Sequence, residues 1–469
     1  MKAIAAGSVI ALAAIGPINA QEVTDANGDA IGLPSVFVTG DLWQTERGKT
    51  TASVSLLDRK ELESPEWGHF DDLSAYLPNL TTTGGTARSR YIQIRGIGEN
   101  SQFEGETPDS AVVFLIDDMD FTGLGSAGSL FDVKQVEVLR GPQAGAFGAN
   151  AAGGLIRIVS AEPTPYWTGT VQTSMGEDSM YGGEIAIGGP LSENDPERLT
   201  MRFALKSQQS DGFYRNEFLG RDDTNEHNET SARFKLRFKE DRYQWDGALL
   251  YVDMNDGYDQ FSMGNDPFRS FSNEPGRDEQ ESLGVSLKGQ FDPGDVFEVT
   301  SKTSVIKTDS FYSYDADWTE ASYAGYLSTL RDREVFNQEI RIDSDSSDLS
   351  RWTVGLYYQN LLEDSDVHYR DGDPSQGEFS FGQADVDSIY ETETIAAFGQ
   401  MAFELNEETR IIAGLRYEMH EVVFDSVSNE LGYYQGFLYD GKNGNDDDVF
   451  GGKLTLEHDF NTDVMAFAS

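Results

Sequence analysis

The feature that most constrains the fold is a run of amphipathic strands that fills the chain from Trp167 to its end. Bulky apolar residues alternate with polar or charged ones over most of this run. We count about thirteen such segments, each near the length of a long barrel strand rather than a short sandwich strand. An apolar face opposite a charged face suits a wall between lipid and a wet lumen, so the pattern predicts an antiparallel transmembrane β-barrel over 167–469.

Four segments show the alternation most clearly. Because successive side chains of a strand point to opposite faces, each apolar set is predicted to share one face and each polar set the other. The opposed sets are Leu199, Met201, Phe203 and Leu205 against Arg202 and Lys206; Phe234, Leu236 and Phe238 against Arg233, Lys235, Arg237 and Lys239; Trp352, Val354, Leu356 and Tyr358 against Thr353 and Gln359; and Ile411, Ala413, Leu415 and Tyr417 against Gly414, Arg416 and Glu418.

The connections between the strands alternate in length, which favours a barrel over a sandwich or a propeller. Brief periplasmic turns and long external loops are typical of outer-membrane barrels. The short turns are predicted near 190–198, 239–243, 291–296, 343–350, 404–409 and 459–463. The long polar loops are predicted at 208–230, 254–278, 309–331, 364–388 and 424–448, with one tight connection on the same side near 176–181.

The end of the chain predicts an incomplete barrel. Residues 461–469 open a new strand and then stop. Outer-membrane transporters close at about 22 strands, and an open edge would leave amides and carbonyls unpaired in lipid. We therefore expect a barrel of the 22-stranded type, truncated in this chain by roughly nine strands.

The start of the chain predicts export. Residues 1–20 combine one Lys, a short apolar stretch and small residues, the pattern of a secretory signal peptide cleaved before Gln21. No later segment has about 18 consecutive apolar residues, so no membrane-spanning helix is expected. Residues 21–50 are expected to form an N-terminal segment that includes a short extended stretch at 36–40.

Composition excludes several classes of function. The chain has no cysteine, so neither a disulfide framework nor a thiolate metal site is possible. Its formal net charge of −46 argues against a nucleic-acid partner. The five histidines lie apart in the sequence, with no catalytic or metal-binding order: His69, His227, His368, His420 and His458. We expect no enzymatic activity, no resident metal and no cofactor.

Residues 51–163 predict one compact mixed α/β domain. Val54–Leu56 and Arg90–Arg95 alternate as strands, and Ala111–Ile116 is a nearly continuous apolar run, as for a buried strand. Phe70–Leu77 has helical spacing and ends at Pro78. Residues 131–160 form two strands that flank a glycine-rich segment.

Four other patterns in the chain are interpreted as turns or loops rather than sites. The GxGxxG at 123–128 leads into a strand instead of the helix that a dinucleotide site needs, and the glycines at 148–154 lack the Lys and Ser/Thr of a phosphate-binding loop. Asp117-Asp118 is a possible carboxylate pair, but a turn after a buried strand is favoured. The acidic run at 444–448 lacks the ligand spacing of a calcium loop and is expected to be a solvated loop.

The mixed domain closely resembles the plug of the TonB-dependent receptors. The motifs that carry the resemblance stand in the family's order: LPNL at 77–80, IRGIG at 94–98, VEVLRGPQ at 136–143 and AAGGLIRIVS at 151–160. QEIRID at 338–343 and WTVGLYYQN at 352–360 also resemble recurring barrel strands of the family. The resemblance implies an N-terminal plug inside an outer-membrane barrel of a Gram-negative bacterium, in contact with lipid and lipopolysaccharide, as a monomer.

The resemblance also implies roles for particular residues. The stretch before the plug is similar to a TonB box, which would add as a strand to the partner TonB. The alternative is that this stretch forms the first strand of the small domain. Its residues are Val36, Phe37, Val38, Thr39 and Gly40. The plug motif comprises Arg95, Gly96, Arg140, Gly141, Pro142, Gly153 and Gly154. By resemblance, Arg95 and Arg140 would anchor the plug to carboxylates of the barrel wall.

A scarce ligand is expected to bind between the external loops and the outward loops of the plug. Aromatic side chains above a lumen can stack on catechols, hydroxamate scaffolds or sugars, although an interfacial aromatic girdle is the alternative. The candidate residues are Gln102, Phe103, Tyr312, Tyr314 and Trp318. The cargo implied by the resemblance is a ferric siderophore, with cobalamin, haem and oligosaccharide as alternatives. A passive porin, an adhesin barrel and an exported hydrolase are the alternatives of other classes.

Overall fold

The computed structural model describes most of the chain from Phe37 onward. The described residues are 37–38, 42–43, 45–46, 49–62, 67–74, 76–83, 87–99, 110–142, 151–264, 266–294, 296–320, 325–344, 351–372, 381–432, 440–461 and 464–469. The predicted signal peptide at 1–20 and the candidate residues Gln102 and Phe103 lie outside this set. Among the described residues, no helix is long and apolar enough to cross a membrane.

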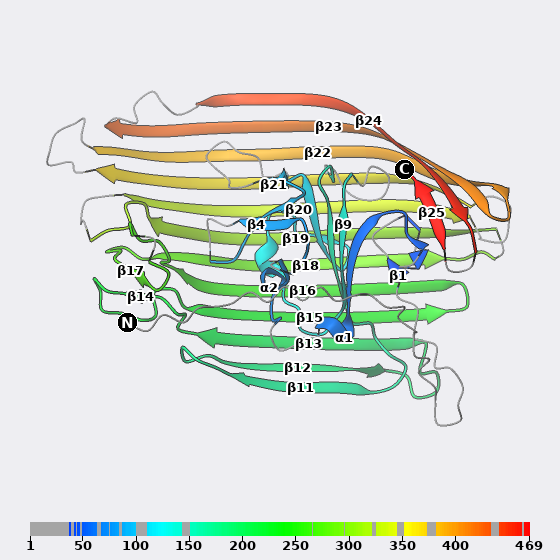
Figure 1. The fold of residues 1–469 in the computed structure, drawn as a ribbon, viewed down its shortest axis with the longest axis horizontal. Helices are drawn as coiled ribbons and strands as arrows, with labels where there is room; N and C mark the ends of the chain where they lie inside the picture. The colour runs from blue at the N-terminus through cyan, green and yellow to red at the C-terminus, as the bar shows by residue number, and fades with distance from the viewer. Residues whose placement is uncertain are drawn as a thin grey trace, which may run out of the picture.

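One antiparallel sheet of thirteen strands forms a curved wall, as predicted (Figure 1). Each strand pairs with the next one along the wall in sequence order, so the sheet is a continuous meander. The strands are β11 (Thr168–Met175), β12 (Tyr181–Pro190), β13 (Leu199–Ser210), β15 (His227–Glu240), β16 (Tyr243–Tyr258), β18 (Gly276–Phe291), β19 (Phe297–Asp315), β20 (Tyr326–Ser344), β21 (Trp352–Gly372), β22 (Phe381–Asn406), β23 (Thr409–Gly432), β24 (Gly441–Asp459) and β25 (Met465–Ala468).

The polarity of the wall is the reverse of that in a soluble protein. Leu356 and Leu415 on its outer face are 60% and 56% exposed, whereas Thr353 and Arg416 on the inner face are 0% and 7% exposed. Apolar side chains that face outward at this density are stable only against lipid. The predicted division of each strand into an outward apolar and an inward polar set is therefore confirmed.

The strands run further than predicted, into the segments expected to be long loops. β22 has 26 residues, which at about 3.3 Å per residue spans roughly 85 Å, far more than an apolar band about 25 Å tall. The run at 444–448 lies within β24, so its prediction as a loop is wrong. Beyond the lipid both faces of a strand are wet, so paired strands continue there without apolar alternation, the signal on which the prediction relied.

The plug is a separate five-stranded sheet in the order β3-β9-β10-β7-β8, and Figure 1 shows it against the concave side of the wall. Its strands are β3 (Ser53–Asp58), β7 (Val112–Ile116), β8 (Met119–Asp120), β9 (Val133–Arg140) and β10 (Gly154–Ser160). A smaller sheet and three short helical elements complete it: β4 (Leu80–Thr83), β5 (Tyr91–Ile94), β6 (Ile97–Gly98), α1 (Arg59–Leu62), α2 (Phe70–Ser74) and η2 (Gly125–Ala127). The predicted boundary at 163–167 falls in the connection between β10 and β11.

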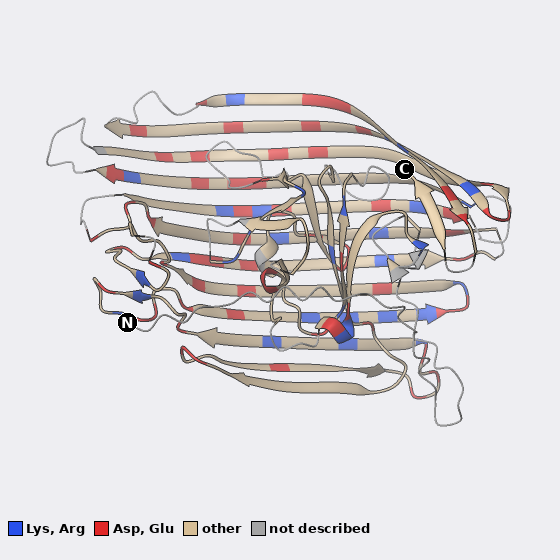
Figure 2. Ribbon diagram, in the orientation of Figure 1, with Lys and Arg blue, Asp and Glu red and all other residues tan. Residues whose placement is uncertain are grey.

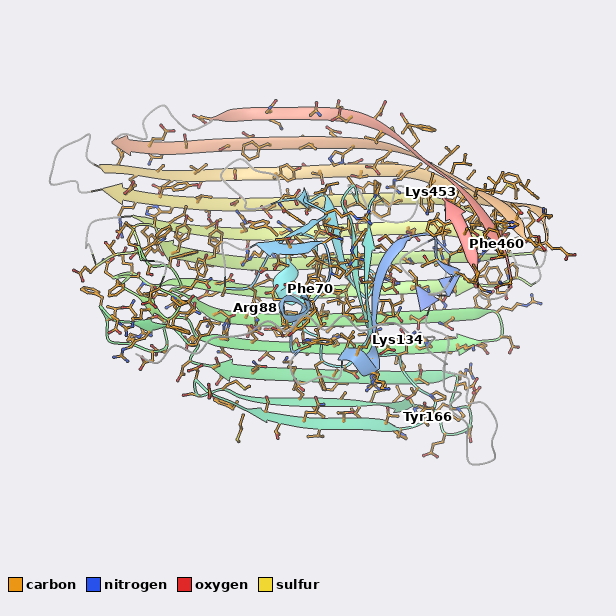
Figure 3. The ribbon with its side chains drawn as sticks, viewed as in Figure 1. Phe70, Arg88, Lys134, Tyr166, Lys453 and Phe460 are labelled. Atoms are coloured by element: carbon orange, nitrogen blue, oxygen red, sulfur yellow. The ribbon has the colours of Figure 1, made fainter. Side chains whose placement is uncertain are left out.

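A shared apolar core joins the plug to the wall. Phe70 and Phe114 of the plug pack edge to face at 5.2 Å, and the same cluster includes Leu250 and Ile306 of the wall. Figure 3 shows Phe70 inside the curve of the wall. A Cβ on Gly284 of β18 would lie 2.7 Å from the sulfur of Met119, so the plug approaches the wall backbone closely.

The glycine-rich stretch at 123–128 forms a turn, as predicted. Its helical part is η2, three residues long, and β9 follows five residues after it. A Cβ on Gly128 would lie 2.8 Å from the Cβ of Phe70, so close packing requires glycine there. Such a short element offers no helix N-terminus for a pyrophosphate.

Candidate functional site

The two ends of the wall differ in their connections. Short turns join the strands at one end, and longer connections at the other end carry the small strands β14 (Arg215–Asn216) and β17 (Arg269–Ser270). We call these the turn end and the loop end; the loop end lies at the left of Figure 1. Outer-membrane barrels have their long connections outside the cell, so the loop end is expected to face outward.

An aromatic cluster lies at the loop end. Phe261 and Tyr314 pack edge-on against the ring of Tyr258, at centroid distances of 5.6 and 6.3 Å. Phe261 also stacks on Trp318 at 5.3 Å. Two of the predicted ligand-binding residues, Tyr314 and Trp318, are thus joined through side chains that the prediction did not include.

Tyr312 lies between two guanidinium groups, one from the plug and one from the wall. The Cζ atoms of Arg90 and Arg331 lie 5.8 and 5.7 Å from the centroid of its ring. Cation–π contacts of this length are worth about 0.5–2 kcal/mol each. Because Arg90 belongs to the plug, the Tyr312 ring faces the lumen and not the lipid. Tyr312 therefore does not belong to an aromatic girdle at the membrane interface. Its role in ligand binding stays a prediction.

Tyr91 of β5 lies beside this arrangement. Burial raises the pKa of the Tyr91 phenol, and the positive charge of Arg331 only partly opposes the rise. The phenol is therefore neutral at physiological pH and can donate a hydrogen bond to an oxygen-rich ligand. Arg90, Tyr91, Tyr312 and Arg331 thus bring cations, rings and a hydroxyl together at one place, where Arg90 and Arg331 are buried.

Ion pairs hold the plug to the wall, and their polarity differs between the two ends. Near the loop end the plug supplies the cations: Arg90 Nη2 donates to Asp278 Oδ1 at 2.6 Å, and Arg88 Nε donates to Glu229 Oε1 at 2.6 Å. Nearer the turn end the plug supplies the anions, as where Lys235 Nζ lies 3.0 Å from Asp117. The same polarity recurs in the pairs Arg202–Asp132, Lys302–Asp118 and Arg237–Glu162.

Asp117 and Asp118 form a turn, as predicted, and both also bind cations. Burial would raise the pKa of each carboxyl group, but nearby cations outweigh it: Lys235 and bonds from Ser160 at Asp117, and Arg157 and Lys302 at Asp118. Both pKa values therefore end below the usual range. The turn thus anchors the plug to the wall as an ionised pair.

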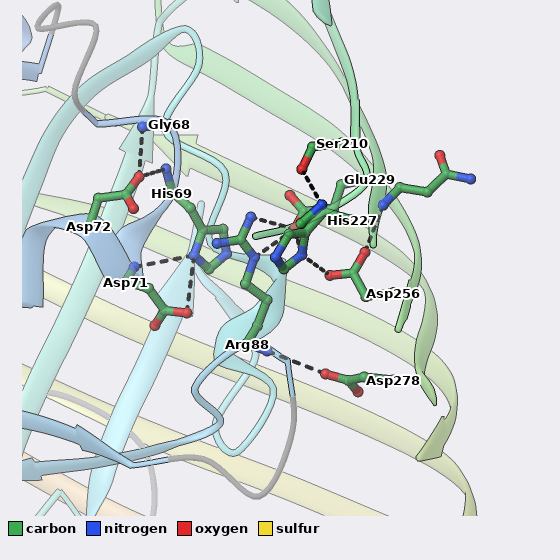
Figure 4. Close-up of polar contacts among 12 residues, drawn as sticks. Gly68, His69, Asp71, Asp72, Arg88, Ser210, His227, Glu229, Asp256 and Asp278 are labelled. Carbon is green, nitrogen blue, oxygen red and sulfur yellow. Dashed lines mark hydrogen bonds and ion pairs between the residues drawn. The ribbon is translucent and has the colours of Figure 1, made fainter. Parts of the chain in front are cut away.

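Figure 4 shows a cluster of histidines and carboxylates around Arg88. His227 Nδ1 lies 2.9 Å from Asp256 Oδ2, and Glu229 Oε1 accepts from Arg88. His69 of the plug lies on the other side of the guanidinium group in this view. The scattered histidines predicted no such cluster, because only the fold brings these residues together.

A cavity of about 630 Å³ lies between the plug and strands β11–β13 and β15. Its lining is mixed, with cationic, imidazole, acidic and apolar groups, among them Arg88, Lys206, His69, His227, Asp132, Glu184 and Trp67. The cavity reaches the cluster of Figure 4, since Arg88, His69 and His227 belong to both.

The plug-motif glycines have positive φ or closely packed backbones. Gly154 has φ +147°, and a Cβ there would lie 2.3 Å from the carbonyl oxygen of Leu139. Gly153 donates from its amide to Ala111 O at 2.8 Å and accepts from Gly141 at 3.1 Å, which joins three segments of the plug. Gly96 and Gly141 also have positive φ, at 77° and 95°. These residues shape plug turns.

Arg95 and Arg140 do not bind barrel carboxylates within the described residues, so that expectation is wrong there. Arg95 Nη2 donates to Ser53 Oγ at 2.9 Å, and Arg140 donates to Ser55 Oγ at 2.8 Å and Pro78 O at 3.0 Å. The reason is topological: Arg140 stands on β9, an inner strand of the plug sheet, between Ser53 of β3 and Gly154 of β10. Arg88 and Arg90 instead form ion pairs with carboxylates of the wall.

The described part of the segment resembling a TonB box is paired with a second short strand. Of its five residues the structure describes two, β1 (Phe37–Val38), which pairs antiparallel with β2 (Thr45–Glu46). Val38 is fully buried in a cluster with Leu42 and Trp43. Trp43 Nε1 donates to Thr353 Oγ1 at 2.8 Å, which places the segment at the turn end of β21. Val36, Thr39 and Gly40 lie outside the described residues.

The sequence alone does not single out Arg88, Arg90 and Arg331. Arg88 and Arg90 stand two apart in the run RSRYIQIR, so they share a side of an extended segment, and this spacing was the available signal. Nothing in the sequence pairs them with particular carboxylates of the wall, because those pairings span 141 and 188 residues.

A mixed plug seated against a wall with an apolar outer face defines the class, a plugged outer-membrane β-barrel. Two family models match the chain: the TonB-dependent receptor plug domain over 46–155, and the TonB-dependent receptor-like β-barrel over 167–469. The chain therefore belongs to the TonB-dependent receptors, which are proteins of the Gram-negative outer membrane. The family and the plug-plus-barrel fold implied by the sequence are confirmed.

Curated relatives match part of the chain. An iron-regulated outer membrane virulence protein of Vibrio cholerae is 31% identical over 151 residues, which are 30% of this chain and 23% of that protein. The pesticin receptor of Yersinia enterocolitica is 27% identical over 206 residues, 43% of this chain and 30% of that protein. The matched stretches thus span less than a third of these relatives.

Solved structures share the fold over a larger part. The ferric yersiniabactin uptake receptor of Yersinia pestis superposes with a TM-score of 0.76 at 19% identity, covering 89% of this chain and 63% of that one. A siderophore receptor of Acinetobacter baumannii gives a TM-score of 0.69 at 15% identity, covering 89% and 64%. At these identities the likeness concerns the fold alone.

Proposed function

We propose that this protein is an importer that binds a ferric siderophore at the loop end and releases it inward with energy delivered by TonB. The observation that carries the proposal is the position of Tyr312 between Arg90 of the plug and Arg331 of the wall. A ferric siderophore offers negative charge, oxygen atoms and often aromatic rings. Guanidinium groups, a neutral phenol and stacked rings complement each of these.

The relatives support this cargo class. The similar structures include receptors whose names state ferric yersiniabactin and siderophores as their ligands. The curated relative of Vibrio cholerae is described as iron-regulated. Since the matched stretches are a fraction of those proteins, the activity of the whole protein is part of the proposal.

The plug links the two ends of the lumen. Arg90 and Tyr91, at the start of β5, belong to the proposed ligand site, and the sheet of β3, β9 and β10 packs on the cluster that holds Val38 at the turn end. Ligand bound to Arg90 would compete with its bond to Asp278 and loosen the plug from the wall. TonB would then take the 36–40 segment as an added strand. We further propose a monomer whose outer face contacts lipid and lipopolysaccharide.

The test is a binding panel on the purified protein in detergent. Ferric catecholate, hydroxamate and citrate complexes are compared with cobalamin, haem and maltooligosaccharides by fluorescence quenching. We expect one ferric complex to bind and Tyr312→Ala to weaken its binding about tenfold, because the substitution removes the ring that is proposed to stack on the ligand and that lies between Arg90 and Arg331. Phe311→Ala is the matched control, because Phe311 neighbours Tyr312 on β19 and points to the opposite face. Tight binding of cobalamin, haem or a sugar in place of every iron complex would overturn the cargo.

A second measurement separates a receptor from a passive pore. Cells that carry a deletion of 36–40 are expected to bind the ferric complex and to stop importing it. Import that continues unchanged without this segment would contradict the TonB-dependent mechanism and favour a porin.

A further inference from the structure

Three side chains able to bind a metal ion meet on the wall at the loop end, around the guanidinium group of Arg88 (Figure 4). His227 and Glu229 stand two apart on β15 and share its inner face, and Asp256 comes from the neighbouring strand β16. Their ligand atoms all lie within 4.8 Å of one another. His227 pairs with Ser210 of β13, Glu229 with Met254 of β16, and Asp256 with Asp278 of β18, so each of the three groups stands on a paired strand.

The spacing suits a first-row transition metal. His227 Nδ1 lies 2.9 Å from Asp256 Oδ2 and 3.9 Å from Glu229 Oε1. Ligands about 2.05 Å from a zinc ion are separated by roughly 3.3 Å in a tetrahedral site and 2.9 Å in an octahedral one. The separation between the carboxylate oxygens of Glu229 and Asp256 is also within 4.8 Å. The ligand atoms would therefore close by up to roughly 1.5 Å to coordinate one ion, a movement that side-chain rotation can supply.

The donor set selects among metals. One imidazole nitrogen with two carboxylate oxygens suits zinc and similar divalent transition metals. Magnesium and calcium prefer oxygen ligands alone, so the histidine disfavours them. Three protein ligands leave further positions for water, or for a donor atom of a bound molecule.

The surroundings support occupancy by a cation. The three proposed ligands include two carboxylates, Glu229 and Asp256, and one guanidinium group, that of Arg88, lies beside them. A further cation would therefore be attracted electrostatically. Asp256 is 1% exposed, and the amide of Asn228 fixes its Oδ1 at 2.8 Å, so the carboxylate is preorganised. The cavity of about 630 Å³ is lined by His227, which gives an ion a path to the site.

We propose that His227, Glu229 and Asp256 form a binding site for a divalent transition-metal ion of the zinc type, and that the ion competes with Arg88 for Glu229. Arg88 Nε donates to Glu229 Oε1, the oxygen that lies 3.9 Å from His227 Nδ1. An ion among the three ligand atoms takes the same oxygen and repels the guanidinium group. Because Arg88 belongs to the plug, occupancy of the site loosens one contact between plug and wall. The site is independent of the cargo proposed above.

The first experiment measures metal binding directly. The full chain is purified in detergent, stripped with a chelator and titrated with ZnCl₂ against a chromophoric competitor. We expect one zinc ion per chain, and at least about tenfold weaker binding in His227→Ala and in Asp256→Asn. His368→Ala is the matched control, because His368 pairs with one carboxylate, Asp385, on the same wall and belongs to no such trio. X-ray absorption at the zinc edge should show one imidazole among oxygen ligands.

A second variant tests the competition. Arg88→Gln removes the rival cation and is expected to tighten zinc binding about tenfold, whereas a structural role of Arg88 in the site predicts weaker binding. The proposal is overturned if the wild type binds no zinc above the level of His227→Ala, or if the absorption spectrum shows no imidazole. Circular dichroism of each variant confirms that the barrel is folded, and His227→Gln replaces His227→Ala if the alanine variant is not.

Discussion

Arg90 and Asp278 form a deeply buried ion pair between plug and wall, with side chains 2% and 1% exposed. Removing one partner of such a pair leaves an uncompensated charge in a medium of low dielectric constant. We expect Arg90→Met to weaken docking of the plug by about 3–5 kcal/mol. The measurement is the rate of limited proteolysis in the plug of detergent-purified protein, compared with that of the wild type.

The double variant Arg90→Met/Asp278→Leu distinguishes charge from packing. Replacing both partners removes the stranded carboxylate, so the double variant should resist protease better than Arg90→Met alone. A double variant that is digested faster than both Arg90→Met and Asp278→Leu would contradict the assignment of the effect to an unpaired charge.

Asp117 and Asp118 make the contacts near the turn end resistant to acid. The pKa of each is lower in the folded protein than in an unfolded chain, mainly because Lys235 and Arg157 outweigh the effect of burial. Such a group adds stability above the unfolded value near 4 and loses it as the pH falls through the lower folded value. We expect hydrogen exchange of β7 and β10, corrected for its intrinsic pH dependence, to be constant from about pH 7 to 5 and to rise only below about pH 4. Asp118→Asn should reduce that rise, and protection lost between pH 5 and 7 would disprove the assignment.

At the scale of elements, Trp43 fastens the β1–β2 pair to the wall. The pair has two residue pairs only, which is too little pairing to be stable alone. Trp43 donates to Thr353, and the Arg351 guanidinium lies 4.8 Å from its ring centroid. We expect Trp43→Ala to free the segment, measured as severalfold faster maleimide labelling of a Thr45→Cys variant. The chain has no natural cysteine, so the label reports this position alone.

Two substitutions of Trp43 distinguish the contribution of its hydrogen bond from that of its aromatic ring. Trp43→Phe keeps an aromatic ring under Arg351 and loses the donor to Thr353, so its labelling rate should fall between those of wild type and Trp43→Ala. Trp318→Ala at the loop end is the control and should leave the rate unchanged. Equal rates in all four proteins would show that Trp43 does not hold the segment.

How far the sequence predicts this molecule depends on whether a feature is local. The plug strands, the turn at Asp117-Asp118 and the two faces of the wall follow from period-two alternation and from glycine and proline positions, so they could be predicted. The lengths of β21–β24 could not, because a strand outside lipid needs no apolar face and its sequence looks like a loop. The contacts of Arg88, Arg90 and Tyr312 join residues far apart in the chain, and no local pattern encodes them.

On the scale of the whole molecule, the negative charge is arranged in rows across the wall. Asp253, Glu281, Asp309, Asp332 and Asp364 stand directly opposite one another on five neighbouring strands, and all five are exposed on the outer face. Figure 2 shows acidic positions along the strands well beyond the region of the plug. Like charges at opposed positions of a sheet destabilise it, so this row lowers the stability of the folded protein. Salt should reduce the effect by screening the charges.

Two substitutions on β20 should therefore have opposite effects. Asp332 lies between Asp309 and Asp364, so Asp332→Asn removes the charge repulsion with both neighbours. The substitution should stabilise the protein by about 0.5–1 kcal/mol. Glu334, two residues further on the same face, lies 3.5 Å from Lys307, so Glu334→Gln should be neutral or slightly destabilising. Both effects are measured by urea unfolding in detergent at low ionic strength.

The gain from Asp332→Asn should shrink in about 0.15 M salt, where charges are screened over about 8 Å, and in millimolar magnesium. A gain that is the same at every salt concentration would mean that Asp332 acts through packing or hydrogen bonding, and the row of carboxylates would not be a source of repulsion.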